Sequence, residues 1–457
     1  MAFQSLALTQ SQERTLARSN TARNVCAVYR LDAHPDATRL ADAITQATNH
    51  CEQLAYRTID SEDGTRFIVQ RDAGFELKII DIGERSQATE LSLIEGLCAR
   101  KFRMDMGLPW SFTLLLAGEQ SFLVFACHPA LLDRFSLKSL FDALSDAYGG
   151  EALAPALGLD QRGLLEAEQS LLASEHLATS LEFWIGQLGK SSFEWHAPRI
   201  ENGSAENCFT TSLDAAASRD FCALADTLAM APDVLLLLCV HVLLHRLTSN
   251  STVLTAYHQR GCGRTSTGIG FDERRRVLRT EFDDSMTLRE FLRHAAARLD
   301  MNYFHGDVPA FEVLDEMEHR IPGYVSATNV LCEADSLPYD ALRLGTLKAT
   351  LLAPFSRGTP HQDVAIYLDV REQVSLHIQL RHPQELDGVR MAFEHGMALL
   401  MRLRDVLDQE IDAIDLYTPA LHASRLAWSD GGRSPCLPRM CSTCLRRPSG
   451  SMVNFRP

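Results

Sequence analysis

The sequence predicts an α/β protein with two halves, and three observations support this fold class. In the first half, apolar or alternating stretches typical of strands occur at residues 24–31, 66–70, 76–82, 110–116 and 121–127. Apolar residues spaced three and four apart predict helices at 38–49, 136–148 and 164–188. The same succession returns in the second half, with helices expected at 216–229, 232–247, 288–302 and 388–409 and strands at 251–257, 342–352, 363–369 and 373–380. We therefore expect two α/β halves, each with its own core.

Composition and charge limit the classes of partner. The 457 residues are 46% hydrophobic and 23% charged, which is ordinary for a globular protein. The formal net charge of −15 argues against nucleic acid as the main partner, because phosphate binding needs a basic face. The longest apolar run, residues 234–244, is too short to cross a membrane and is typical of a buried helix. Because the chain shows no secretory start, we expect its 12 cysteines to be free thiols in the cytoplasm.

Two groups of residues have metal-ligand spacing, and in both we favour a structural interpretation. Cys436, Cys441 and Cys444 form a C-x4-C-x2-C pattern, but no fourth ligand is near and the segment is rich in proline, serine and arginine. We expect a disordered tail there. His241 and His245 lie four residues apart on one very apolar helix, with no acidic or cysteine partner evident. We expect core histidines at these positions and no metal.

One segment is organised like a catalytic turn. An apolar strand leads into His128, and an aspartate (Asp133) and a serine (Ser136) follow before an amphipathic helix begins. Ser136 is a good N-cap residue for that helix. However, the residue after the histidine is Pro129, whose ring has no acid–base function.

Short motifs along the chain resemble, in order, those of one enzyme family. The segment HPALLDRFS at residues 128–136 is similar to the family signature H-H-x-x-x-D-G-x-S. Other matching segments are TQSQER (9–14), CEQL (51–54), FRMDMGLP (102–109), FWIGQL (183–188), LLHRLT (243–248) and HGDVP (305–309). By these motifs the chain resembles, over about residues 6–425, the condensation domains of nonribosomal peptide synthetases.

The resemblance implies an architecture. Members of this family consist of two α/β sandwich subdomains, each like chloramphenicol acetyltransferase, arranged as a V-shaped pseudo-dimer. We accordingly expect an N-terminal subdomain over residues 1–175, a C-terminal subdomain over 176–425 and a disordered tail over 426–457. No cofactor is expected to be bound, because the family's substrates ride on the phosphopantetheine arms of carrier proteins that enter a tunnel between the two halves.

The departures from the signature concern catalysis. The second signature histidine, credited with proton handling or with orienting the amine, is replaced by Pro129. Adjacent strand residues face opposite sides, so we expect His128 to be a core histidine; a repurposed base is the alternative. The signature glycine is replaced by Arg134. We expect this arginine to obstruct the tunnel, by crowding it or by closing it with a salt bridge. The alternative is that Arg134 lies on a solvated surface.

The remaining signature residues are expected to hold the scaffold. By resemblance, Asp133 pairs with an arginine at the end of the later strand. Arg260 is the candidate for this arginine, and Arg264 is the fallback. Ser136 is expected to be a structural residue of the same turn. We treat His305 as structural. The charged run at 272–276 is expected to be a solvated face, with docking of an acidic carrier protein as the alternative.

The resemblance therefore implies a condensation-like domain of nonribosomal peptide biosynthesis that is catalytically impaired. It would bind peptidyl or acyl carrier proteins and other synthetase modules, or recruit a tailoring enzyme, with no nucleic-acid or membrane partner. The alternative is an active acyltransferase that forms an amide or ester between carrier-bound thioesters. A free-standing acetyltransferase that uses acetyl-CoA is a third hypothesis, which no feature of the sequence favours.

Overall fold

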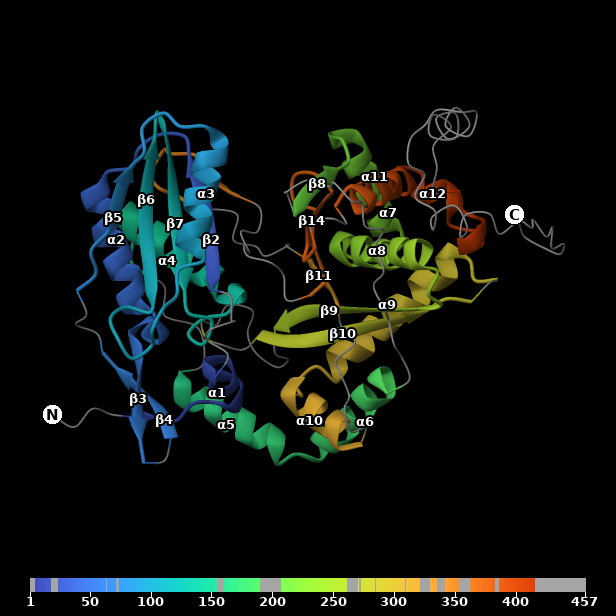
Figure 1. Cartoon of the computed structure of the whole chain (residues 1–457), viewed down its shortest axis with the longest axis horizontal. Helices are drawn as coiled ribbons and strands as arrows, with labels where there is room; N and C mark the ends of the chain where they lie inside the picture. The colour runs from blue at the N-terminus through green and yellow to red at the C-terminus, as the bar shows by residue number, and fades with distance from the viewer. Residues whose placement is uncertain are drawn as a thin grey trace.

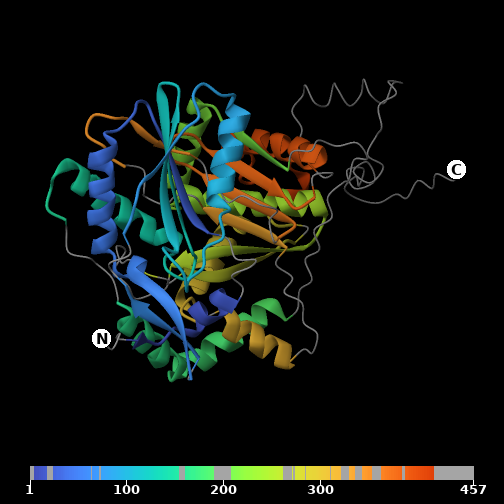
Figure 2. The same ribbon diagram turned by 60° about the vertical axis from the view of Figure 1, so that its left-hand side comes forward.

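Two α/β halves stand side by side in the computed structural model of the chain (Figure 1). Figure 2 shows the blue-to-cyan N-terminal sheet in front of the green-to-orange C-terminal sheet. This arrangement confirms the predicted fold class. The structure describes residues 5–17, 24–62, 64–70, 74–153, 160–189, 207–260, 270, 273–283, 285–308, 310–320, 329–334, 342–352, 362–382 and 386–415.

A five-stranded sheet forms the centre of the N-terminal half. Its order is β12-β2-β7-β6-β5, made of β2 (Val25–Leu31), β5 (Lys78–Asp81), β6 (Trp110–Ala117), β7 (Gln120–Cys127) and β12 (Ala349–Leu351). Helices α2 (Ala37–His50) and α4 (Leu137–Gly149) pack on one face, and α3 (Gln87–Cys98) packs on the other. Strand β7 is therefore buried on both faces, which explains why its sequence is apolar almost throughout.

A smaller sheet and several helices lie beneath the two halves (Figure 1). The small sheet has the order β1-β4-β3, formed by β1 (Ser5–Leu6), β4 (Gly64–Val69) and β3 (Tyr56–Ser61), and η1 (Glu52–Ala55) precedes it. The helices near it are α1 (Gln10–Ala17), α5 (Gln161–Leu172), α6 (Glu175–Leu188) and α10 (Ala310–Arg320). The predicted single helix at 164–188 is in fact α5 and α6, which are separated at residues 173 and 174.

A six-stranded sheet forms the centre of the C-terminal half. Its order is β10-β9-β11-β13-β14-β8, made of β8 (Cys208–Ser212), β9 (Thr252–Arg260), β10 (Glu273–Glu281), β11 (Val330–Ala334), β13 (Val364–Asp369) and β14 (Ser375–Leu380). The helices of this half are α7 (Ala215–Thr227), α8 (Pro232–Thr248), α9 (Leu288–Phe304), α11 (Leu386–Met401) and α12 (Leu403–Val406), followed by η4 (Ile411–Ala413). Helix α8 has eleven buried residues, in agreement with the core helix predicted from its apolar run.

One strand from late in the chain belongs to the N-terminal sheet. Ala349 pairs with Leu31 and Leu351 with Tyr29, so β12 forms an antiparallel ladder with the edge of β2. From the sequence, this segment was expected in the C-terminal half. Pairing satisfies backbone groups that β2 would otherwise expose along that edge. The predicted division near residue 175 itself stays a prediction.

Three described helices, α1, α3 and α10, were not expected from the sequence. Helix α3 buries only Ile94 and Cys98 strongly and shows a weak apolar stripe, and α10 is rich in acidic residues. Among the described helices, none by itself has the length and apolar character to cross a membrane. Only α7 and α8 taken together meet that condition by length and composition, with a bend of 100° between them.

Candidate functional site

The signature segment forms a tight turn between β7 and α4. The N–H of His128 donates to the carbonyl oxygen of Pro109 at 2.8 Å, which fixes the end of β7. Asp133 then caps the short helix η2 (Arg134–Ser136): its Oδ1 accepts from the N–H of Ser136 at 2.8 Å and lies 2.7 Å from the Ser136 hydroxyl. Asp133 is 1% exposed and Ser136 is fully buried, so these bonds are shielded from water.

Gly270 ties this turn to the C-terminal half. Its N–H donates to Ser136 Oγ at 3.0 Å, and its carbonyl oxygen accepts from the N–H of Asp133 at 3.3 Å and lies 2.8 Å from Ser136 Oγ. Asp133 and Ser136 thus position the turn against a segment from the other half. Arg260 ends β9, where it pairs with Glu273, but its side chain and Arg264 lie outside the described residues. The pairing of Asp133 with either arginine stays a prediction.

His128 is placed as a buried, neutral imidazole. It is 3% exposed, and burial lowers its pKa to about 4. The N–H of Ala130 donates to its Nδ1 at 3.2 Å, so the ring proton is on Nε2, which has no hydrogen-bond partner among the described residues. An imidazole with Nδ1 engaged and a proton already on Nε2 has no nitrogen available to accept another proton. This geometry favours the core-histidine interpretation over the repurposed base.

The residues beside His128 offer no replacement base. Pro129 is half-buried and has no acid–base group. Cys127 is fully buried, and burial raises the pKa of its thiol well above the ordinary value, so it remains a thiol at neutral pH.

Arg134 makes an ion pair with the C-terminal sheet. Its Nη1 lies 2.6 Å from Oε2 of Glu333 on β11, and the two side chains are 18% and 8% exposed. The other oxygen, Glu333 Oε1, contacts Nδ1 of His258 on β9. Arg134 is therefore part of a salt bridge and does not lie on a solvated surface. We call Arg134, Glu333 and His258 the inter-half network.

The sheet face that carries this network is turned away from α8. Thr255 Oγ1 bonds to His241 on α8, so the next residue of β9, Ala256, faces the opposite side. Ala256, Leu331 and two residues of β13 form a small apolar cluster on that side. His258 and Glu333 lie two residues further along their strands, on the same face. Nothing in the sequence pairs residues 75 positions apart, so neither His258 nor Glu333 could be predicted from it.

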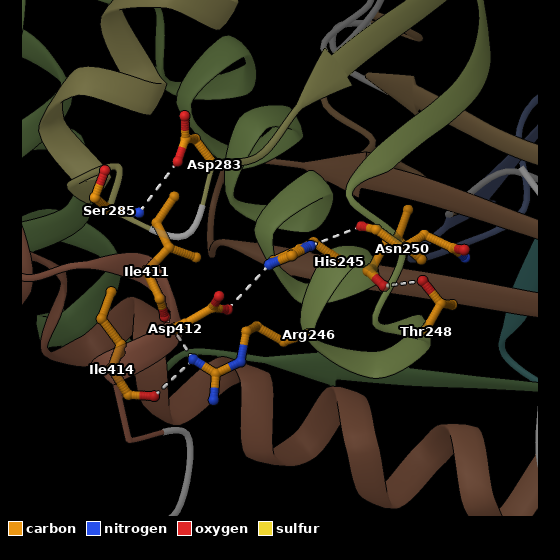
Figure 3. Close-up of polar contacts among 10 residues, drawn as sticks. His245, Arg246, Thr248, Asn250, Asp283, Ser285, Ile411, Asp412 and Ile414 are labelled. Atoms are coloured by element: carbon orange, nitrogen blue, oxygen red, sulfur yellow. Dashed lines mark hydrogen bonds and ion pairs between the residues drawn. The ribbon is translucent and has the colours of Figure 1, made fainter. Parts of the chain in front are cut away.

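The two histidines of α8 have structural partners, and Figure 3 shows those of His245. His245 Nδ1 lies 2.7 Å from the carbonyl oxygen of Asn250, and its Nε2 lies 3.1 Å from Asp412 Oδ1. The expectation that His245 has no acidic partner was wrong, because Asp412 is 167 residues away in the sequence. His241 is fully buried between two threonine hydroxyls, and burial lowers its pKa to about 3. No group of three or more metal-ligating side chains occurs within the described part of the chain.

Two further expectations can be compared with the structure. His305 is buried, lies 2.9 Å from Ser180 Oγ through Nδ1 and stacks on Phe183 with a ring separation of 4.3 Å. Arg276 was expected on a solvated face, but it is 3% exposed and donates to the Val308 carbonyl oxygen at 2.9 Å. It is buried because it faces the helices, where its guanidinium lies over Trp184. The side chains of the rest of that run, and the cysteine tail, lie outside the described residues.

Comparisons with known proteins show what the chain is similar to. A family model described as "Condensation domain" matches residues 3–322. A plipastatin synthase protein of Bacillus subtilis (strain 168) is 23% identical over 403 residues, which cover 84% of this chain and 15% of that protein. A linear gramicidin synthase protein of Brevibacillus parabrevis is 22% identical over 397 residues, covering 83% of this chain and 8% of that protein. The chain thus spans a small part of the length of these curated relatives.

Solved structures with the same fold are also condensation domains. The first condensation domain of the CDA synthetase has a TM-score of 0.75 at 15% identity and covers 91% of this chain and 100% of that chain. The condensation domain of the Monacolin K polyketide synthase has a TM-score of 0.76 at 17% identity, with 90% and 100% covered. The starter condensation domain of rhizomide synthetase, solved with C8-CoA, has a TM-score of 0.73 at 18% identity, with 90% and 97% covered.

Proposed function

Because the chain belongs to the condensation-domain family, we propose that it acts in nonribosomal peptide biosynthesis as a catalytically impaired condensation domain that binds carrier proteins or recruits a tailoring enzyme. The observation that carries this proposal is the state of the signature turn. By resemblance to the family signature, Pro129 stands where the family has its proton-handling histidine, and His128 is a buried imidazole whose Nδ1 accepts from the N–H of Ala130. Losing a general base typically slows a reaction about 10²–10⁴-fold.

The proposal includes carrier proteins as partners and phosphopantetheine as the group that presents the substrates. Its support is that the curated relatives are parts of peptide synthetases, and that a solved neighbour holds C8-CoA, which contains the same pantetheine arm. We place the protein in the cytoplasm, where its free thiols stay reduced.

The inter-half network strengthens the case for impairment. Arg134 stands where the family has glycine, and its ion pair with Glu333 joins the signature turn to the face of the C-terminal sheet turned away from α8. In the family the reacting groups meet between the two halves. An ion pair that stays closed there would hinder the arms from meeting, while leaving the outer surfaces free to bind carriers.

The test is acyl transfer between two loaded carrier proteins, measured by intact-protein mass spectrometry. A donor carrier bearing octanoyl and an acceptor carrier bearing leucyl are suitable probes, because a neighbour was solved with C8-CoA and Leu-SNAC. We expect the natural protein to bind the carriers but to transfer at a rate close to the uncatalysed one. Efficient transfer that is lost in His128→Ala would refute the proposal.

One observation favours a second candidate, an active acyltransferase. His258 is 27% exposed, and Glu333 holds its Nδ1 in the way that a carboxylate orients a catalytic imidazole. Nε2 of His258 would then exchange the proton with the attacking amine. If the natural protein transfers octanoyl and His258→Gln abolishes transfer while His128→Gln does not, this candidate replaces the first.

A further inference from the structure

Two cysteines from separate elements meet where the end of helix α3 rests on the N-terminal sheet. Cys26 lies near the start of β2, and Cys98 is the last residue of α3. Cys98 belongs to the apolar cluster between α3 and this face of the sheet, and Cys26 packs against that cluster. The Sγ atom of Cys26 lies 3.6 Å from the carbonyl oxygen of Cys98. The two thiols are also hydrogen-bonded to each other.

The side chain of Asn24 fixes the backbone at this point. Its Nδ2 donates to the carbonyl oxygen of Cys98 at 2.8 Å and also to that of Arg100. These carbonyl oxygens lie at the end of α3, where the helix itself provides no partners. Asn24 therefore holds the backbone of Cys98 to the strand that carries Cys26, independently of the two thiols. Such preorganisation lowers the entropic cost of linking the two cysteines.

Helix α3 has few other strong attachments to the sheet. Among its described side chains only Ile94 and Cys98 are strongly buried, at 0% and 4% exposed, whereas Leu93 is 39% exposed. An element with few buried apolar contacts opens more readily than the core of a protein. A covalent bond at Cys98 would therefore limit the opening of this helix.

The surroundings of Cys26 keep the pair reduced until an oxidant is abundant. The hydrogen bond to the Cys98 thiol, together with burial, raises the pKa of the Cys26 thiol well above its ordinary value. Because the thiolate is the reactive form, a raised pKa slows oxidation at neutral pH. Cys26 is half-buried and Cys98 is almost fully buried, so Cys26 is the more accessible of the two to a small oxidant.

We propose that Cys26 and Cys98 form an oxidation site, at which hydrogen peroxide closes an intramolecular disulfide that fixes the end of α3 to β2. Sulfur atoms in hydrogen-bond contact need to approach by only about 2 Å to reach the length of a disulfide bond. The structure describes the reduced form, in which both cysteines are free. This inference does not depend on the proposed function, because it involves neither carrier proteins nor the signature turn.

The reaction consumes one peroxide for each disulfide. The Cys26 thiolate attacks one oxygen of the peroxide and becomes a sulfenic acid, and the hydroxide that leaves takes up the thiol proton as water. The sulfur of Cys98 then attacks the sulfenic sulfur, which forms the S–S bond and releases a second water. The two thiols together lose two electrons and two protons, and the peroxide is reduced to two molecules of water.

The test maps disulfides in the full-length protein before and after treatment with hydrogen peroxide. Free thiols are blocked with iodoacetamide, and the protein is digested with trypsin in the absence of a reductant. Cleavage after arginine places Cys26 on the peptide 24–30 and Cys98 on the peptide 86–100, each with a single cysteine. We expect oxidation to link these two peptides, at a mass two hydrogen atoms below their sum, and dithiothreitol to separate them.

Matched variants distinguish this pair from general oxidation of cysteines. Cys98→Ser should leave Cys26 as a sulfenic acid that dimedone traps, because the second thiol is gone. Cys222→Ser removes another half-buried cysteine, on α7, whose thiol no described cysteine contacts, and it should form the linked peptide as the natural protein does. The proposal is overturned if the two peptides stay separate at peroxide concentrations that convert the exposed Met106 to its sulfoxide.

Hydrogen exchange measures the effect of the bond on α3. The amides of this helix should exchange at least about tenfold more slowly in the oxidised natural protein than in the reduced protein, because the linked helix cannot leave the sheet by itself. In Cys26→Ser, peroxide should leave the exchange of α3 unchanged. Equal exchange in the oxidised and reduced natural protein would show that the disulfide does not fix this helix.

Discussion

Replacing Arg134 by methionine and Glu333 by glutamine, singly and together, isolates the ion pair that joins the two halves. Each single change removes one charge and keeps most of the side-chain volume. The difference between the double variant and the sum of the single variants is the coupling free energy of the pair. Trp110 in the N-terminal core and Trp184 in the C-terminal half allow the unfolding of both halves to be followed by fluorescence in urea.

The structure sets the size of this coupling. The two side chains are 18% and 8% exposed and are 2.6 Å apart at their charged atoms. Two unit charges about 4 Å apart at an effective dielectric constant near 20 attract by about 4 kcal/mol, and loss of hydration offsets part of this. Because His258 stays in contact with Glu333 after Arg134 is replaced, the carboxylate is not left alone. We expect a coupling of about 2 kcal/mol, within the range measured for close charge pairs.

An exposed pair provides the control. Arg289 and Asp408 are 2.6 Å apart, but they are 50% and 77% exposed. Their coupling should be much smaller than that of the buried pair, because water screens both charges, and it should fall further with added salt. If the coupling between Arg134 and Glu333 is as small and as sensitive to salt as that of the control pair, the ion pair does not hold the two halves together and the reasoning is wrong.

Two further predictions concern the cores. Burial holds the pKa of His128 near 4 and that of His241 near 3, below the unfolded value of about 6.5. At a pH between the folded and unfolded pKa values, the unfolded state therefore binds more protons than the folded state. Because of this difference, the free energy of unfolding falls as the pH falls. From pH 8 to pH 5.5 each histidine should lower the free energy of unfolding in urea by about 1.4 kcal/mol, and His241→Gln should lose about half the combined dependence; an unchanged dependence in that variant would contradict this. Gly396→Ala places a Cβ 2.5 Å from Leu243 Cδ1 and should cost about 1–3 kcal/mol in the same assay. Gly186→Ala in α6, where the new Cβ has nothing within 4 Å, should instead stabilise by up to about 1 kcal/mol, and a reversed order would refute the packing argument.

Local patterns predicted many of the strands and the core helices, but they missed others, such as β8 and β10, and they did not reveal partners that are distant in the sequence. The alternation at 24–31 and the apolar run of α8 depend on burial, which leaves a trace in neighbouring residues. By contrast, β12 joins the N-terminal sheet from residue 349 onward, and Asp412 reaches His245 across 167 residues. Such contacts come from tertiary packing, which brings together segments that are distant in the sequence.

The candidate site likewise has one part that the sequence predicted and one part that it did not. The signature turn could be found because its residues are close in sequence and resemble a motif. The inter-half network could not, because its three members come from three distant segments. Arg276 was misjudged for a related reason: a charged run suggests a wet surface, but every second residue of a strand can face the helices.

The proposed impairment predicts that restoring transfer takes two substitutions, because it assigns an obstacle both to Pro129 and to Arg134. Pro129→His returns an imidazole to the strand end, yet the Arg134–Glu333 pair still joins the halves beside it. Arg134→Gly removes that pair and restores the small residue of the signature, but it supplies no base. With octanoyl and leucyl carriers, we expect Pro129→His alone to transfer weakly and the double variant to exceed it at least about tenfold.

Arg134→Gly alone should stay at the background rate, even though it loses the coupling of about 2 kcal/mol that the pair contributes. That loss of stability without a gain of activity is the control, since it shows that the ion pair has opened. If the double variant transfers no faster than Pro129→His, the ion pair does not hinder the meeting of the two arms, and the missing base alone accounts for the impairment.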